Sequence, residues 1–225
     1  MLFLDKVKEK YANPKNVFEI GAHRGYDIPE MVEAFPEANI YAFEADPYNY
    51  NICKQNCSEY ENVHVYNQAV YNTNKEMTFN RFCDIENIPD TETLKGQNLQ
   101  FTGCGSLHKP GVGLTEIYKI KDVVEEIKVQ AVTLQWFCNK HEIDSIDALF
   151  MDVQGAEMNV IQGAGDTLMS TINALVLEWS TNYTLYENET DFIYIKQYLE
   201  DVLKLKETQR EYQLQGLNGD SLFLR

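Results

Sequence analysis

The chain has 225 residues, and its 35 Asp and Glu against 19 Lys and Arg give a formal net charge of -16. Such an acidic surface disfavours nucleic acid as a partner, because affinity for nucleic acid depends mainly on Lys and Arg neutralising phosphates. With 44% hydrophobic residues the sequence has the apolar content of a folded chain, and its length predicts a single domain over residues 1–225.

The start of the chain and the cysteines are typical of a cytoplasmic protein. No stretch approaches the roughly 20 apolar residues of a membrane span, and Met1–Tyr11 lacks the apolar run of a signal peptide. Five cysteines without a CxxC pair predict reduced thiols. Cys53 and Cys57 are expected to pack in the core rather than to bind zinc. We therefore expect a soluble cytoplasmic protein with no membrane partner, and no motif specifies its oligomeric state.

The first half of the chain alternates short apolar runs with helical stretches. A helix is predicted within residues 1–15. The strands that we predict after it are Val17–Ile20, Ile40–Phe43 and Val63–Val70. Helices are predicted between them at residues 28–35 and 47–57, with Pro29 and Pro47 in their first turns. This alternation favours a parallel sheet with helices on both faces.

Residues 82–118 interrupt the alternation with a high content of Gly and Pro. The segment is longer than an ordinary connection in a compact domain. We predict a loop insertion, and two interpretations stay open: a lid over the substrate, or a surface insertion without catalytic use. His108 within it fits either a contact with substrate or an ordinary loop histidine.

Alternation resumes in the second half and ends differently. The predicted strands are Val129–Leu134, Ala148–Met151 and Leu175–Leu177, and the predicted helices cover 135–141 and 189–205. Two further strands, Glu207–Leu214 and Ser221–Leu224, are joined by a stretch with Gly216 and Gly219, which predicts an antiparallel hairpin. The expected fold class is α/β and Rossmann-like, with a mostly parallel sheet, helices on both faces and a C-terminal antiparallel hairpin.

The turn after the first strand has the features of a cofactor loop. Gly21 and Gly25 flank Ala22 and His23 where the chain must turn sharply and let a ligand approach the backbone. The same glycine spacing occurs in plain turns. It is therefore the position after a strand that favours a cofactor loop.

Glu44 points to a cofactor that contains a ribose. It follows the second strand, where a carboxylate can accept hydrogen bonds from both ribose hydroxyls. A dinucleotide site usually carries GxGxxG to cradle a pyrophosphate, and His23 stands in place of its second glycine. S-adenosylmethionine has a ribose but no phosphate, so it fits this loop better, and the charge of Glu19 suits the amino-acid end of that cofactor.

Two alternatives stay open on these observations. The first is an NAD-dependent oxidoreductase on a similar sheet, which the incomplete glycine motif opposes. The second is a catalytically silent module that keeps the cofactor site but has lost the acceptor pocket.

Phe150–Glu157 is the most specific stretch of the chain, with a strand that ends at Asp152, a glycine turn, and Glu157 at a helix start. Further motifs occur in matching order at Phe18–Ala22, Tyr41–Pro47, Asn67–Val70 and Leu177–Glu178. Together they resemble the FkbM family of S-adenosylmethionine-dependent methyltransferases. The resemblance covers roughly Val17 to Glu178, and residues 219–223 also fit the family's last strand.

This resemblance implies a class I methyltransferase fold with a seven-stranded sheet. It also implies O-methylation of a hydroxyl on a sugar or another small metabolite by in-line methyl transfer, so the expected partner is a small-molecule or glycan acceptor. The residues that it places along the cofactor are Gly21, Ala22 and Gly25, with Glu44 on the ribose, Gln68 and Ala69 near adenine, and Asp152 beside the methionine end and the acceptor.

The sequence departs from the family pattern at three places. His23-Arg24 fills a stretch that often holds small polar residues, Ala45 stands where Pro is common, and Gln135 stands where Asp is usual. His23 and Ala45 remain in the predicted cofactor site, and the Gln135 change concerns the anchoring of a loop more than the chemistry.

The acceptor hydroxyl needs a base, and Asp152 is the first candidate, because ligands of such folds bind at the carboxyl ends of strands. Glu157 is a second candidate, with stabilisation of a helix N-terminus as its alternative role. Glu178 is a third, with a structural hydrogen bond as its alternative. His23 and His108 complete the set of candidates. Asp152 and Glu178 could also hold a divalent cation, but their spacing is nonspecific and we expect no metal.

Overall fold

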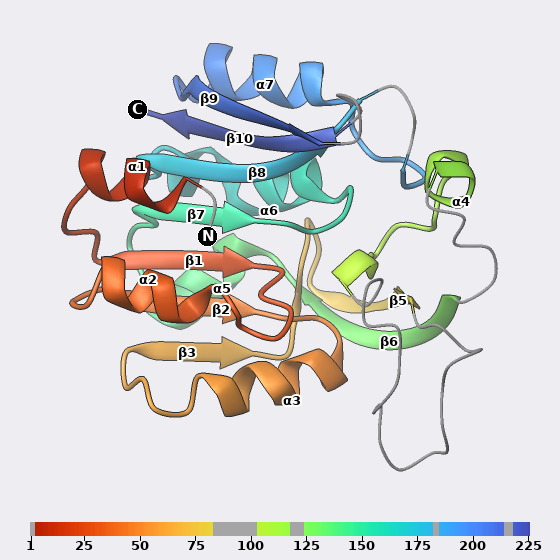
Figure 1. Cartoon of the computed structure of the whole chain (residues 1–225), viewed down its shortest axis with the longest axis horizontal. Coiled ribbons are helices and arrows are strands. Elements are labelled where there is room, and N and C mark those ends of the chain that lie inside the picture. Colours follow the sequence, from red (N-terminus) through yellow and green to blue (C-terminus); the bar gives the residue numbers. More distant parts are fainter. Residues whose placement is uncertain (1–2, 83–102, 118–123, 182–184, 214–217) are drawn as a thin grey trace.

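The computed structural model describes residues 3–82, 103–117, 124–181, 185–213 and 218–225 (Figure 1). Its main sheet has seven strands in the order β3-β2-β1-β7-β8-β10-β9. These strands are β1 (Asn16–Ile20), β2 (Asn39–Phe43), β3 (Val63–Tyr66), β7 (Ala148–Met151), β8 (Ala174–Ser180), β9 (Lys206–Gln213) and β10 (Asn218–Leu224). Neighbouring strands are parallel from β3 to β8, whereas β10 is antiparallel to both β8 and β9. The predicted fold class and the C-terminal antiparallel hairpin are confirmed.

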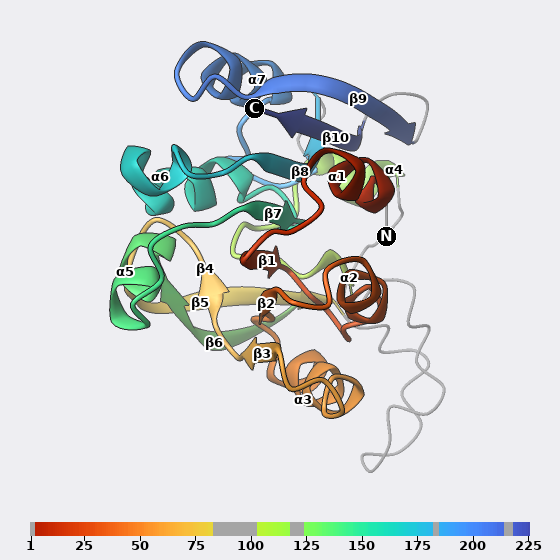
Figure 2. The same ribbon diagram turned by 90° about the vertical axis from the view of Figure 1, so that its left-hand side faces the viewer.

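Helices cover both faces of this sheet (Figure 2). One face carries α1 (Leu4–Lys10), α2 (Ile28–Ala34) and α3 (Pro47–Asn56), and the other carries α5 (Leu134–Lys140), α6 (Glu157–Met169) and α7 (Phe192–Asp201). Successive residues of a strand point to opposite faces, so Val17 is buried against the first helix layer and Phe18 against the second. Burial on both faces explains why the central strands are continuous apolar runs.

A second sheet lies beyond the carboxyl ends of the parallel strands (Figure 1). It consists of β4 (Ala69–Val70), β5 (Lys75–Phe82) and β6 (Val124–Val132), in the order β4-β6-β5. The single strand predicted at 63–70 is therefore wrong: β3 belongs to the main sheet and β4 to the second. The side chain of Asn67 separates them, because its amide donates to the backbone oxygens of Glu44 and Ala45 at 2.9 and 3.1 Å.

The predicted loop insertion at residues 82–118 is partly structured. Phe82 is the last residue of β5, and α4 (Val112–Ile117) lies within the segment. Residues 83–102 lie outside the described residues, so the lid and the surface insertion both stay predictions. Arg81 on β5 forms a bidentate ion pair with Asp46 at 2.6 and 2.7 Å, and Asp46 caps α3 by accepting from the backbone N of Tyr48. This ion pair fixes the second sheet to the main one.

A helix N-cap explains why α7 (Phe192–Asp201) begins later than predicted. The helix predicted at 189–205 begins at Phe192, because the Asp191 side chain accepts a hydrogen bond from the backbone N of Ile193 at 2.9 Å. It ends at Asp201, and Lys204, three residues further on, has a left-handed φ of 60°. Of the helices in the described ranges, none combines the length and apolarity that a membrane crossing requires.

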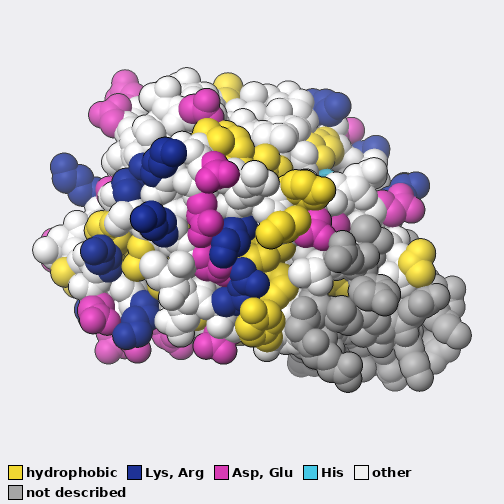
Figure 3. Space-filling model, turned by 90° about the horizontal axis from the view of Figure 1, so that it is seen from above, with side chains coloured by type: hydrophobic (Ala, Val, Ile, Leu, Met, Phe, Trp, Pro, Cys, Tyr) yellow, Lys and Arg dark blue, Asp and Glu magenta, His cyan; other side chains and the backbone are white. Residues whose placement is uncertain are grey.

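The surface above α7 and β9 mixes both signs of charge (Figure 3). Lys, Arg, Asp and Glu side chains alternate over this face beside a band of hydrophobic ones. The exposed hydrophobic residues of α7 and β9 include Ile193, Tyr194 and Tyr212. Charges of both signs thus alternate on this surface.

Candidate active site

A cavity of about 260 Å³ opens at the carboxyl ends of β1, β2 and β7. The chain order reverses between β1 and β7, and such a switch point is where open α/β sheets bind ligands. Every residue predicted to bind cofactor lines the cavity except Gly25; the lining members are Glu19, Gly21, Ala22, His23, Glu44, Ala45, Gln68, Ala69 and Asp152. Their roles toward a cofactor stay predictions, but the structure brings them together.

Gly21 allows the loop after β1 to pack against the end of β7. Its φ is +94°, and a Cβ at this position would lie 1.9 Å from the backbone oxygen of Asp152. The backbone N atoms of Gly21 and Ala22 both donate to the oxygen of Phe43 at 2.9 Å. A side chain at Gly21 would therefore separate the loop from Asp152.

Gly25 packs behind the cavity and is not among its lining residues, so its predicted place along the cofactor stays a prediction. Its φ is +72°, and a Cβ there would lie 2.8 Å from the Sγ of Cys53 and 3.1 Å from that of Cys57. Both cysteines are buried, as predicted. Gly25 thus lets the cofactor loop rest on α3 and supports the cavity wall from behind.

Glu44 is held in a fixed orientation by two backbone donors. Its Oε2 accepts from the N of His23 and its Oε1 from the N of Asp46, both at 2.7 Å. Burial raises the pKa of Glu44 to about 8, although the two backbone hydrogen bonds act in the opposite direction. The carboxyl therefore stands at the cavity wall with little freedom to turn away.

Glu19 presents an unpaired oxygen. The side chain is buried, and its Oε2 has no hydrogen-bond partner among the described residues. Burial and the nearby carboxyls of Asp27, Glu44 and Asp152 raise the pKa of Glu19 well above its usual range. A buried carboxyl oxygen without a donor is costly, so this side of the cavity fits a ligand that brings a hydrogen-bond donor.

Asp152 and Glu178 form a pair at the ends of two adjacent parallel strands. Met151 is in register with Leu177, which places Asp152 beside Glu178, and the Nε2 of Gln154 donates to both carboxyls. Asp152 is open to solvent, yet it is recessed, and the surrounding protein desolvates its carboxyl and raises its pKa. Burial also raises the pKa of Glu178, and the charge of Asp152 adds to this rise.

Glu157 lies in a different place from Asp152. It begins α6 and accepts from the backbone N of Val153 and of Gly155, at 3.2 and 3.3 Å. Burial raises the pKa of Glu157 to about 8. With Glu178 it lines a second cavity of about 10 Å³, which has room for about one water. These contacts favour the structural interpretation of Glu157 at a helix start over a catalytic one.

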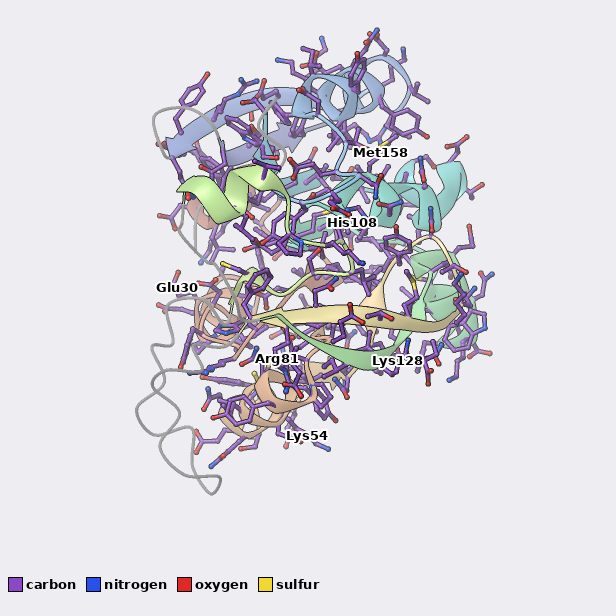
Figure 4. All side chains as sticks on the ribbon, turned by 90° about the vertical axis from the view of Figure 1, so that its right-hand side faces the viewer. Glu30, Lys54, Arg81, His108, Lys128 and Met158 are labelled. Carbon is purple, nitrogen blue, oxygen red and sulfur yellow. The ribbon has the colours of Figure 1, made fainter. Side chains whose placement is uncertain are left out.

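The two candidate histidines are separated. His23 lines the large cavity, and burial lowers its pKa to about 4, so it is neutral near pH 7. His108 is buried between the second sheet and α6 (Figure 4), with its Nε2 at 3.1 Å from the hydroxyl of Tyr71. Its neighbour Leu107, rather than His108 itself, lines the cavity.

The sequence analysis missed one wall of the cavity and the contacts behind Asp152. Phe79 of β5 and the segment 103–107 provide that wall, and Gly105 is needed there, because a Cβ would lie 2.6 Å from the Phe79 ring. Gln154 contacts the acidic pair through side-chain hydrogen bonds, and the Tyr186 hydroxyl in turn donates to Gln154. For Gln154 the signal was available, since it stands inside the motif 152–157.

The cavity region is strongly acidic. In the part of the chain that the structure describes, no Lys or Arg forms an ion pair with Glu19, Glu44, Asp152 or Glu178. No group of His, Cys, Asp and Glu within the described ranges is arranged to hold a metal ion. The site thus combines several carboxyls with no positive partner of their own, which suits a positively charged ligand.

The chain is similar to known methyltransferases in sequence. The family model for the methyltransferase FkbM domain matches residues 19–212. The 2-O-methyltransferase NoeI of Sinorhizobium fredii is 27% identical over 173 residues, which cover 77% of this chain and 66% of that protein.

Solved methyltransferase structures are also similar to this chain. The precorrin-6y C5,15-methyltransferase of Geobacter metallireducens has a TM-score of 0.48 and 12% identity, and the match covers 100% of this chain and 86% of that one. The N-methyltransferase NodS of Bradyrhizobium japonicum has a TM-score of 0.46 and 11% identity, over 99% of this chain and 92% of that one.

Proposed function

Because this chain belongs to the FkbM family of S-adenosylmethionine-dependent methyltransferases, we propose that it methylates a hydroxyl group of a sugar or another small metabolite. The family favours S-adenosylmethionine over the NAD alternative. The observation that carries the proposal is an acidic cavity at the strand ends that contains a buried carboxyl oxygen without a partner. The whole relative is longer than the matched part, so its activity supports the proposal only by analogy.

The cavity residues fit this cofactor. S-adenosylmethionine carries a positive sulfonium and an ammonium group, and the cavity offers carboxyls with no Lys or Arg ion partner among the described residues. The unpartnered Oε2 of Glu19 can accept from the ammonium. Charge and hydrogen-bonding capacity therefore agree on the amino-acid end of the cofactor.

The other end of the cavity suits the nucleoside. Glu44 is fixed by the backbone N atoms of His23 and Asp46, so its remaining lone pairs can accept from ribose hydroxyls without reorganisation. Gln68 and Ala69 line the cavity between the two sheets, where we place the adenine. We therefore place the cofactor along the strand ends, with its amino-acid end at Glu19 and its adenine at Ala69.

When bound at the residues named above, the cofactor would supply an electrophilic methyl group for the acceptor oxygen and a neutral thioether as the leaving group. Asp152 is the residue that takes the proton of the acceptor hydroxyl. It lines the cavity, it is open to solvent, and desolvation raises its pKa, which makes its carboxylate a stronger base. Most of the rate enhancement would come from holding the acceptor in position.

The residues beyond Asp152 limit the class of acceptor. Glu178 is in register with Asp220, and Asp220 with Glu211, so carboxyls follow one another across neighbouring strands away from Asp152. Burial and the charge of Asp152 raise the pKa of Asp220 to about 6. Carboxylates accept from hydroxyl and ammonium groups and repel phosphates. We therefore propose a neutral or cationic acceptor rich in hydroxyls.

A methyl-transfer screen tests this proposal. The purified chain is incubated with S-adenosylmethionine labelled in its methyl group and with matched acceptors: neutral oligosaccharides, amino sugars, and phosphorylated or uronic-acid counterparts. We expect label on a hydroxyl oxygen of a neutral or cationic acceptor. Label only on nitrogen or carbon, or only on the anionic acceptors, would contradict the proposal. Cofactor binding without transfer to any acceptor would favour the silent module instead.

A further inference from the structure

Gln154 makes contacts that its place in a turn does not require. Its φ is 54°, a left-handed value that a non-glycine residue adopts at a cost. Its Nε2 donates to the Oδ1 of Asp152 at 2.5 Å and to the Oε2 of Glu178 at 2.6 Å. Its backbone oxygen accepts from the Oγ of Ser106 at 2.7 Å. The strained conformation is therefore held by hydrogen bonds from several segments.

Tyr186 fixes which way the Gln154 amide points. The single proton of the Tyr186 hydroxyl has two acceptors within reach, and the nearer is the Oε1 of Gln154 at 2.6 Å, against 2.9 Å for the oxygen of Cys104. Burial raises the pKa of Tyr186 well above its usual range, so the hydroxyl keeps its proton. With Oε1 occupied by this donor, the amide turns both of its N–H groups toward the carboxyls of Asp152 and Glu178.

A single nitrogen, the Nε2 of Gln154, contacts one oxygen of each carboxyl, so the carboxyls of Asp152 and Glu178 lie close together. Two carboxyl groups at such short range disfavour double ionisation, and one proton is retained between them. The titratable groups that face the pair from the surrounding elements are Glu19, Asp27, Glu44, Cys104, Glu157, Tyr186 and Asp220. None of these is cationic, so the only fixed donors to the pair among the described side chains are the amide hydrogens of Gln154.

We propose that Gln154, oriented by Tyr186, is a positioning residue that holds Asp152 and Glu178 as a pair sharing one proton, with one negative charge facing the cavity. The proposal rests on the proposed function, in which Asp152 takes the acceptor proton. Because the amide donates to the ionised carboxyls, it makes the shared proton easier to lose. Gln154 thus sets the pH at which Asp152 becomes available as a base.

Binding of a cation beside the pair gives a readout that needs no acceptor. A positive ligand in the neighbouring cavity favours the ionised carboxyls, so it releases part of the shared proton. Calorimetric titration of the full chain with S-adenosylmethionine, in buffers with different ionisation enthalpies and at a series of pH values, measures this release. Asp152→Asn serves as the reference that lacks the release from the pair, and the release that it retains belongs to the other cavity carboxyls, Glu19 and Glu44.

The test variants are Gln154→Gly and Tyr186→Phe. Glycine adopts the left-handed φ without strain, so Gln154→Gly removes the amide and keeps the turn. We expect its proton release to move to higher pH by about one unit, because the donors to the ionised pair are gone. Tyr186→Phe keeps the ring, and we expect a smaller shift in the same direction. Gln162→Ala removes an exposed glutamine from α6 and should cause no shift.

The outcomes separate this inference from the proposed function. If Gln154→Gly and Tyr186→Phe both bind the cofactor with the pH profile of the wild type, the inference is wrong, whatever the acceptor screen gives. If both profiles shift as expected while no acceptor is methylated on a hydroxyl, the inference stands and the proposed acceptor chemistry fails. Thermal unfolding of each variant shows that a shift comes from folded protein, and Tyr186→Phe alone decides if Gln154→Gly does not fold.

Discussion

Two buried or partly buried carboxyl groups in one sheet have opposite surroundings. Glu207 on β9 accepts from Arg210 at 2.6 and 2.7 Å and from Lys196 at 2.5 Å, and these hydrogen bonds outweigh desolvation and lower its pKa to about 2. Glu178 on β8 faces Asp152, and its pKa rises. The chain therefore balances a carboxylate with cations where structure requires it, and leaves the carboxyls of the cavity without them.

The difference extends to the neighbours of each group. Arg210 lies over the rings of Phe192 and Trp179, at 4.6 and 5.2 Å from their centroids, so the Glu207 site is completed by cation–π contacts. For the cavity, by contrast, we propose that a ligand supplies the positive charge. We therefore propose that the acidic cavity destabilises the ligand-free fold and binds a positively charged cofactor.

The largest expected effect concerns the base. Asp152→Asn removes the proton acceptor and keeps the shape, so methyl transfer should fall roughly 10²- to 10⁴-fold. The free energy of unfolding should not fall, because the Asn amide can donate to Glu178 in place of the shared proton. Initial rates with the acceptor found in the screen measure the effect, and Asp144→Asn, an exposed residue away from the cavity, is the matched control. A rate close to that of the wild type would remove Asp152 from the mechanism.

Gly21→Ala tests the backbone of the cavity. The new Cβ would meet the Asp152 oxygen at 1.9 Å in a residue with φ of +94°, so we expect a loss of at least about 3 kcal/mol in the free energy of unfolding and loss of cofactor binding. Gly103→Ala is the control, because no heavy atom lies within 4 Å of its added Cβ. Urea unfolding compares the two, and equal stability would contradict the proposed packing.

Replacing Glu207 and Glu178 by Gln, one at a time, compares how much each carboxyl contributes to the free energy of unfolding. Glu207→Gln leaves Lys196 and Arg210 without their carboxylate, which should cost about 2 kcal/mol. Glu178→Gln can still accept from Gln154 and can donate to Asp152, so stability should change by less than about 1 kcal/mol. A larger loss in the free energy of unfolding for Glu178→Gln than for Glu207→Gln would contradict this prediction.

The cavity carboxyls and Glu207 should affect the pH dependence of the free energy of unfolding in opposite directions. A carboxyl with a raised pKa in the folded chain, such as Glu44 or Glu157 at about 8, contributes stability below its unfolded pKa, and this is lost as pH rises toward 8. Glu207, at about 2, contributes stability above its unfolded pKa, which is lost as pH falls toward 2.

Urea unfolding of the ligand-free chain across pH should therefore show highest stability near about pH 4 to 5 and a fall of at least about 1 kcal/mol by about pH 8. Glu157→Gln should reduce that fall. A stability that rises steadily from about pH 5 to 8 would contradict the pKa directions given for the cavity.

The parts of the cavity that the sequence predicted are those formed by residues close together along the chain. The turn at Gly21 and the strand end at Glu44 are read from neighbouring residues, and their geometry is set by local backbone hydrogen bonds. The alternation of strands and helices and the final hairpin followed from apolar runs and glycines in the same way. The packing of Gly25 on α3 is not visible in the local sequence.

The second sheet could not be predicted by the same reasoning. β4 has only two residues, and β5 carries Lys75 and Glu76 with no regular alternation of burial. Its position depends on the Arg81–Asp46 ion pair, whose members are 35 residues apart. Gln154 has the same difficulty, because Tyr186 and Ser106 lie 32 and 48 residues away from it. Contacts of this range leave no periodic pattern in the sequence.

The most direct test of the central claim is the affinity for S-adenosylmethionine measured by calorimetry between about pH 5 and 7, where the charges of the ligand stay constant. We expect the affinity to rise roughly tenfold over this range as carboxyls of the cavity ionise, with no comparable binding of NAD. An affinity that is flat or falls with pH, or preferential binding of NAD, would show that the cavity carboxyls do not receive a positive cofactor.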